Sequence, residues 1–133
     1  MKEITGLLRE AGYGCLATVE GGMPRVRPFG FMFEEDGRLY FCTNCTKDVS
    51  KQLKKVPYIE YSATTKDMVT LRLNGKVEFT EDMDKKKKVL EASPQVRGLY
   101  KSADNPIFEV FYLEHGTATI ADFSGRPPRE IRF

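Results

Sequence analysis

The segment from Met68 to Thr80 has the most regular polarity pattern in the chain, and it constrains the fold more than any other feature. Apolar residues occupy every second position, and polar or charged residues occupy the positions between them. Successive side chains of a strand point to opposite faces of a sheet, so this pattern predicts a long, half-buried antiparallel strand. Gly75 falls on the apolar side and marks a candidate bend.

Other short apolar runs separated by turn residues predict a sheet connected mostly by hairpins. Pro28 and Gly30 indicate that the second strand is bent, bulged or at a sheet edge, because proline cannot donate to a ladder. His115 and Gly116 are interpreted as the turn between the last two strands. The expected strands are 15–19, 25–33, 38–43, 58–63, 68–80, 107–114 and 117–123, with a short strand possible at the end of the tail.

Apolar residues at helical spacing predict three short helices at the connections, over residues 2–11, 46–56 and 81–92, with a further turn at 96–101. The sequence contains no repeated strand–helix alternation of the kind that builds a doubly wound sheet. We therefore expect a mainly β fold of about six antiparallel strands, and a β-barrel is the arrangement that hides the edges of so small a sheet.

The length and charge of the chain limit its class. A chain of 133 residues is expected to form one domain over residues 1–133. A net charge of +2 is too small to indicate nucleic acid or a membrane surface as a partner, and no apolar run approaches a membrane span. No secretory signal is visible, and three cysteines do not form a disulfide framework, so a cytoplasmic protein is expected.

The stretch from Pro24 to Leu53 concentrates groups that can bind an anion. Arg25 and Arg27 lie two residues apart on one expected strand, and therefore on one face. Thr43 and Asn44 end the next strand. The following helix offers free N–H groups at its start and lysines one turn apart, which favours a phosphate. The sequence thus predicts a site for a phosphorylated small molecule, with Lys47 and Lys51 as its helical cations.

The cysteines allow two other interpretations. Cys42 and Cys45 form a Cys-x-x-Cys pair before a helix, which is the setting of a redox dithiol, but the flanking elements are expected to be antiparallel. Cys15 and His115 could join them in a zinc site, although only one pair has metal-like spacing. The alternative for the arginines and lysines is that they are exposed to solvent and pair with nearby acidic side chains.

The sequence also resembles the pyridoxamine 5′-phosphate oxidase-like family of flavin-binding split barrels, and within it the branch of general-stress and nitroimidazole-resistance-type proteins. The resemblance covers most of the chain from Cys15 to Thr80 and continues in the strand after Pro106. It is carried by the order and spacing of Ala17-Thr-Val, Pro24-Arg-Val-Arg-Pro-Phe-Gly-Phe, Leu39-Tyr-Phe-Cys-Thr-Asn, Lys47-Asp-Val-Ser-Lys-Gln-Leu and Leu71-Arg-Leu-Asn-Gly-Lys-Val-Glu-Phe.

The resemblance implies a six-stranded antiparallel split β-barrel and a homodimer with FMN at its interface. It implies that the strand from Arg25 to Phe29 runs beside the flavin, that Thr43 and Asn44 bond the cofactor, and that the two lysines hold its phosphate. The cofactor-binding residues expected on this basis are Arg25, Arg27, Pro28, Phe29, Thr43, Asn44, Lys47 and Lys51.

Two departures from the family pattern argue against pyridoxamine phosphate oxidation itself. Asp48 and Val49 stand where the oxidase has an Arg-Lys pair, and the chain ends without the Arg-x-His substrate signature. The expected function is therefore that of an FMN-dependent oxidoreductase acting on an unidentified small molecule, with no catalytic residue assigned. The alternatives are a non-catalytic module that binds flavin or haem, and a barrel that acts only through protein contacts.

The interpretation of the cysteines leads to a first test. Replacing Cys42 and Cys45 by serine together should leave the flavin content and any reductase activity nearly intact, because neither thiol is expected to carry electrons. Flavin absorbance and turnover of the double variant check this expectation. Loss of turnover with the flavin still bound would identify the pair as a redox motif.

Overall fold

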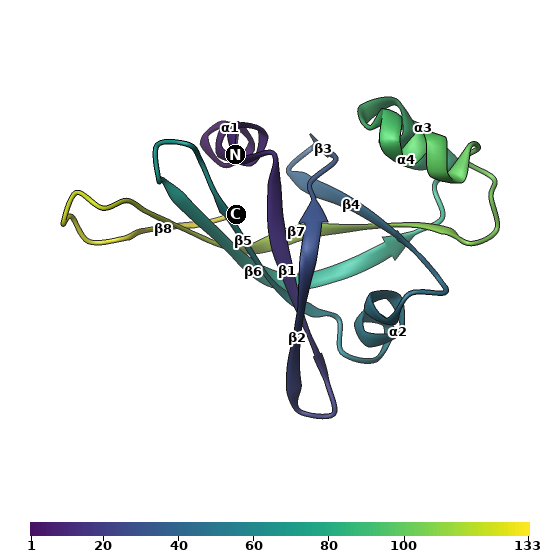
Figure 1. The fold of residues 1–133 in the computed structure, drawn as a ribbon, viewed down its shortest axis with the longest axis horizontal. Coiled ribbons are helices and arrows are strands. Elements are labelled where there is room, and N and C mark those ends of the chain that lie inside the picture. The colour runs from purple at the N-terminus through teal and green to yellow at the C-terminus, as the bar shows by residue number, and fades with distance from the viewer.

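The computed structural model describes residues 1–133, and its main feature is one antiparallel sheet of eight strands (Figure 1). The sheet order is β2-β1-β5-β6-β7-β4-β3, and β8 pairs with β7. The strands are β1 Tyr13–Glu20, β2 Met23–Gly30, β3 Phe33–Glu35, β4 Arg38–Asn44, β5 Tyr58–Thr64, β6 Thr70–Thr80, β7 Phe108–Ala121 and β8 Arg129–Arg132. The helices are α1 Lys2–Ala11, α2 Asp48–Lys55, α3 Met83–Ala92 and α4 Pro94–Tyr100.

The mainly β, split-barrel fold expected from the sequence is confirmed, with two differences in detail. The sheet has eight strands rather than about six, because β3 and β8 are short strands of their own, while the strands expected over 107–114 and 117–123 form the single strand β7. The pairing does not close into a complete barrel, since its two ends are β2 and β3. These end strands follow one another in the chain, and only Phe31 and Met32 separate them.

The strand expected around Gly75 is β6, which pairs along its whole length with β7. The hairpin expected at His115 and Gly116 is wrong, because β7 runs through both residues without a turn. Gly116 faces Gly75, and a Cβ atom on Gly116 would lie 2.2 Å from the carbonyl oxygen of Asn74. The register shifts between Gly75 and Val77. Glycine is therefore needed here for a close approach of two strands rather than for a reverse turn.

β2 lies at the edge of the sheet, as its proline and glycine content indicated. The expected strand 25–33 ends at Gly30 in the structure, and β3 begins at Phe33. Pro24 and Pro28 pair with Val19 and Cys15 of β1. A proline nitrogen has no hydrogen to donate, so an edge strand is where the two prolines cost the fewest ladder bonds.

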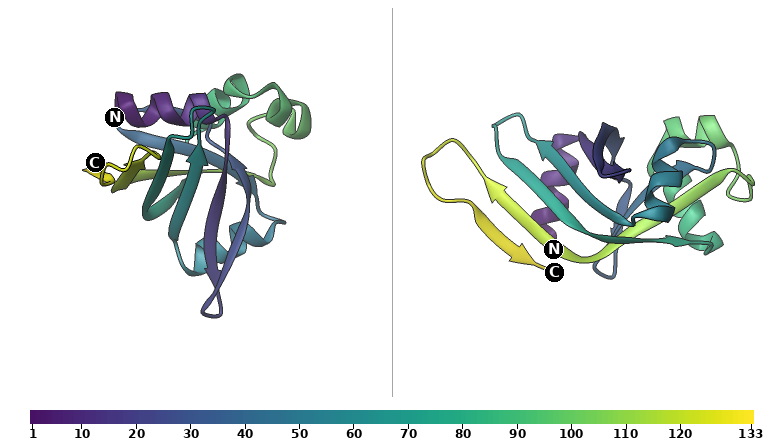
Figure 2. Two further views of the ribbon diagram at one scale, coloured as in Figure 1. Left: turned by 60° about the vertical axis from the view of Figure 1, so that its left-hand side comes forward. Right: turned by 90° about the horizontal axis from the view of Figure 1, so that it is seen from below.

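Two apolar clusters hold the helices to the sheet. The larger joins α1 and α2 to the strands through Ile4, Leu8, Val49 and Leu53, which are all buried. The smaller lies under α3 and α4, which pack together at one end of the molecule (Figure 2). Lys85 and Lys88 of α3 both pair with Glu35 of β3 and fix this end. No helix is both long and apolar enough to cross a membrane.

The contact between Gly75 and Gly116 gives a stability test. Gly116→Ala should lower the free energy of unfolding by about 1–3 kcal/mol, because the new methyl group meets backbone that cannot rotate away. Denaturant unfolding measures the change. Gly98→Ala is the matched control, since its Cβ would have no neighbour within 4 Å and alanine favours the helix. Equal stability of the two variants would contradict the close approach.

Candidate functional site

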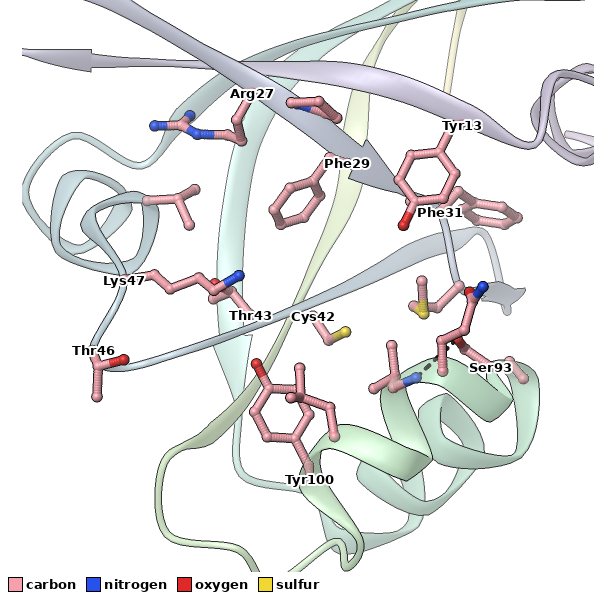
Figure 3. A pocket seen from close by; sticks show the side chains of 18 of the residues that line it. Tyr13, Arg27, Phe29, Phe31, Cys42, Thr43, Thr46, Lys47, Ser93 and Tyr100 are labelled. Atoms are coloured by element: carbon pink, nitrogen blue, oxygen red, sulfur yellow. Dashed lines mark hydrogen bonds between the residues drawn. The ribbon is translucent and has the colours of Figure 1, made fainter.

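A cavity of about 800 Å³ lies at the open side of the sheet (Figure 3). Residues 27–32 of β2 and the link after it form one wall, and β4 forms the opposite wall. The start of α2 closes one end, and the α3–α4 pair closes the other. The cavity volume is in the upper part of the range of roughly 300–1,000 Å³ found for small-molecule sites.

The end of the cavity next to α2 carries all of its charged side chains, which are Arg27, Lys47 and Asp48. Lys47 is the N-cap residue of α2, is exposed, and forms no ion pair. No side chain caps this helix, and the backbone N–H groups of Asp48 and Val49 donate no hydrogen bond. Unpaired N–H groups, the helix dipole and a free ammonium group together favour an anion, and the Asp48 carboxylate opposes it.

Arg27 is held by a network that connects three elements. Its guanidinium donates to Thr18 Oγ1 and to Gln52 Oε1, both at 2.7 Å, and to the carbonyl oxygen of Leu16 at 3.3 Å. The Thr18 hydroxyl in turn donates to Gln52 Oε1 at 2.5 Å. Burial lowers the pKa of Arg27 and nearby Asp48 raises it, and the guanidinium remains charged. Arg27 thus fixes α2 against β1 and β2 while placing a positive charge in the cavity wall.

Thr43 carries a buried hydroxyl that the chain itself leaves without a hydrogen-bond partner. Its side chain is 4% exposed, and Oγ1 is the only buried side-chain nitrogen or oxygen atom in the chain without a hydrogen-bond partner. Leaving such a group unpaired costs about 1–3 kcal/mol. Because Thr43 lines the cavity, a bound molecule could supply the missing partner.

Asn44 follows Thr43, but both the oxygen and the nitrogen of its amide are bonded within the protein. Its Oδ1 accepts from the backbone N–H of Thr46 at 3.0 Å and from the Thr46 hydroxyl at 2.5 Å. Its Nδ2 donates to the Tyr100 hydroxyl at 2.7 Å. Asn44 therefore shapes the turn before α2 and anchors α4, and it does not line the cavity.

Cys42 does not have the environment of a reactive thiol. Burial raises the pKa of Cys42 to about 12, and the charge of Lys47 offsets only part of this rise. The thiol of Cys42, which lines the cavity, therefore stays protonated at neutral pH. All three cysteines are free, and no three histidine, cysteine or acidic side chains meet in a group that could hold a metal ion. His115 lies on the exposed side of β7.

The cavity brings together five of the residues selected from the sequence: Arg27, Pro28, Phe29, Thr43 and Lys47. Arg25 lies outside it and is paired with Glu20 at 3.4 Å. Lys51 is exposed one turn further along α2 and is not a lining residue. The sequence patterns do not indicate the lining residues Tyr13, Leu99 and Tyr100, because no local pattern brings α4 or the start of β1 to this wall. They assign Met32 only to an expected strand.

The cavity thus has two chemically different ends. The end at α2 offers cations and free N–H groups, whereas the end at α4 is lined by uncharged side chains. Such an arrangement can bind a molecule with an anionic group at one end and an apolar or aromatic body at the other.

Comparisons with known proteins agree with this fold. The chain is 38% identical to a NimC/NimA family protein from Clostridium acetobutylicum, with a TM-score of 0.92 over 100% of this chain and 93% of that chain. A heme-binding protein from Mycobacterium smegmatis has a TM-score of 0.81 at 17% identity, over 98% of this chain and 56% of that one. A pyridoxamine 5′-phosphate oxidase-related, FMN-binding protein from Nostoc punctiforme has a TM-score of 0.68 at 16% identity, over 97% of this chain and 85% of that one.

A search of the curated proteins found no match. The family model described as pyridoxamine 5′-phosphate oxidase, in contrast, matches residues 1–119. This match spans most of the chain and agrees with the split-barrel neighbours. The chain therefore belongs to the pyridoxamine 5′-phosphate oxidase family.

Proposed function

We propose that the cavity binds FMN and that the protein is a flavin-dependent oxidoreductase acting on a small molecule. The observation that carries the proposal is Thr43, a lining residue with a buried hydroxyl that has no partner, in the same cavity as the free N–H groups of α2. A buried polar group without a partner is rare in folded proteins. The FMN-binding relative from Nostoc punctiforme supports flavin as the ligand class.

The phosphate of FMN would lie at the start of α2. Lys47, the unpaired backbone N–H groups of Asp48 and Val49, and the charge of Arg27 all favour an anion there. Asp48 is the opposing charge, and its carboxylate would have to point away from the phosphate. Lys51 is expected to contribute less than Lys47, since it lies outside the cavity.

The flavin ring system would lie between β2 and β4. Pro28 and Phe29 offer an apolar wall there, and Thr43 offers its hydroxyl to a ring or ribityl oxygen. Bound FMN would accept electrons from a donor and pass them to a substrate. The protein's part is to position the cofactor and the substrate and to keep water from the apolar end of the cavity.

Haem is the second ligand to consider, because one structural neighbour is a heme-binding protein. The single histidine of the chain, His115, does not line the cavity, and the Cys42 thiol is held in its protonated form. Histidine and thiolate are the common axial ligands of haem iron. The lining residues therefore favour flavin over haem.

We further propose that a second copy of the chain covers the mouth of the cavity. Tyr13 and Leu99 line the cavity, yet their side chains are 66% and 65% exposed. Val26, on the edge strand β2, is 68% exposed. Large exposed apolar side chains around a ligand site are typical of an interface, and a two-fold axis would create two equal sites.

The phosphate proposal is tested by comparing FMN with riboflavin, which lacks the phosphate. Lys47→Ala should weaken FMN binding by about 1.5 kcal/mol, or roughly tenfold, because it removes one charge-assisted hydrogen bond from an exposed position. Riboflavin binding should change little. Fluorescence titration of the apoprotein with each ligand measures both affinities.

Lys55→Ala is the control for this titration, since Lys55 is exposed at the far end of α2 and has no ion-pair partner. Lys54 would be a poorer control, because its ammonium group pairs with Glu109 and lies over the Phe79 ring. Equal losses for FMN and riboflavin in Lys47→Ala would assign Lys47 to the fold rather than to the phosphate.

The second copy is tested by sedimentation. The flavin-loaded protein should sediment as a dimer at micromolar concentration, because the cavity of one chain leaves its apolar rim exposed. Leu99→Glu should shift the protein toward monomer and weaken flavin binding in parallel. A monomer with fully bound flavin would contradict the shared site.

A further inference from the structure

The amide of Asn44 fixes the orientation of the Tyr100 hydroxyl. The oxygen of this amide must face Thr46, because the backbone N–H of Thr46 can only donate. The nitrogen of the amide therefore faces Tyr100 and donates to the phenol oxygen at 2.7 Å. Asn44 is 7% exposed, so water does not compete for these contacts.

The phenol proton of Tyr100 consequently has no acceptor within the chain. The phenol oxygen accepts from Asn44, and the hydroxyl donates to no group in the chain. The side chain is 6% exposed and lines the cavity. In Figure 3 its hydroxyl points toward Thr43. Burial raises the pKa of Tyr100, and the hydrogen bond from Asn44 opposes part of this rise, so the phenol is protonated at neutral pH.

The position of Tyr100 is held by packing as well as by the amide. Its ring stacks on Phe108 of β7 with the ring centroids 4.9 Å apart. Lys85 and Lys88 fix the preceding helix α3 to Glu35, so the whole α3–α4 pair is tied to the sheet. A donor on a rigid support loses little entropy when it binds a ligand.

The surroundings of this donor limit its partner. Met32, Cys42, Val96 and Leu99 line the same end of the cavity, and none of them is charged. The cation that lies toward this end, Lys47, is assigned to the phosphate of the flavin, so a carboxylate or phosphate would lose its hydration here without gaining a cation of its own. An uncharged molecule with an apolar body would bury that body and place one acceptor oxygen at the phenol.

We propose that Tyr100, oriented by Asn44, is the hydrogen-bond donor that selects a carbonyl-type oxygen of an uncharged, largely apolar substrate. The assignment rests on the proposed flavin site, since it presumes that the cofactor occupies the α2 end of the cavity. Tyr100 would bind and polarise the substrate oxygen, and Asn44 acts through Tyr100 as a positioning residue.

A matched pair of probes tests the proposal. 1-Indanone and indane have the same ring skeleton and differ by one oxygen atom in place of two hydrogens. Their dissociation constants are measured by calorimetry on the protein with and without added FMN, and flavin content is recorded from absorbance. The carbonyl stretching frequency of bound 1-indanone, read by infrared spectroscopy, reports the hydrogen bond directly.

Tyr100→Phe should weaken 1-indanone binding about three- to tenfold relative to indane, the factor that one neutral hydrogen bond contributes. The carbonyl frequency of the bound probe should rise toward its value in an apolar solvent. Asn44→Asp should have the same two effects, because a carboxylate oxygen would accept the Tyr100 proton and turn it away from the cavity. The two variants thus remove the donor by different means.

Tyr112→Phe is the control, since this buried tyrosine donates to Glu78 at 2.9 Å and does not line the cavity. It should leave the ratio of the two affinities unchanged. An unchanged ratio and an unchanged frequency in Tyr100→Phe would overturn the assignment. Weaker FMN binding with an unchanged 1-indanone ratio would also overturn it, because the acceptor would then belong to the flavin. Absence of flavin absorbance in all samples would overturn the proposed function. The ratio of the 1-indanone and indane affinities would still test the role of Tyr100 as a donor.

Discussion

The unpaired edge of β2 is the constraint on which the cavity depends. If β2 paired with the opposite end of the sheet, formed by β3 and β4, the sheet would close and its side chains would fill the space between these strands. Two prolines weaken the capacity of β2 to take another partner, and the chain leaves the strand after Gly30. The opening is bordered by α2, which the hydrogen bonds of Arg27 attach to β1 and β2, and by α3 and α4. The same edge therefore prevents closure of the barrel and leaves the space in which a ligand can bind.

Most of the fold could be predicted because local pattern and tertiary environment agree. The two-residue alternation of β6 matches a strand with one buried face, and the spacing of Ile4 and Leu8 matches a helix with one buried stripe. Gly116 shows where the agreement fails. A glycine after a polar residue resembles a turn, yet the reason for it is the backbone of β6, which meets β7 only in three dimensions. The spacing of residues in the sequence cannot reveal that contact.

The site was predictable where its residues are neighbours in the chain, and not where they meet through the fold. Arg27, Thr43 and Lys47 belong to one strand–strand–helix segment, so their convergence follows from short connections. Asn44 and Tyr100 are 56 positions apart, and nothing in the segment around Tyr100 indicates a ligand. The sequence also could not show that the Asn44 amide is hydrogen-bonded inside the protein whereas the Thr43 hydroxyl has no partner.

The long strand β7 has a consequence for the order in which the molecule assembles. It pairs with β6 on one edge, and with β4 and then β8 on the other. β4 emerges early during synthesis, but its partner on β7 is made only after α4 is complete. A chain emerging from the ribosome must therefore hold its N-terminal half without the central strand, with sheet edges open to other chains. Pairings this distant in sequence slow folding, because the entropy of closing the loop is lost before the contacts form.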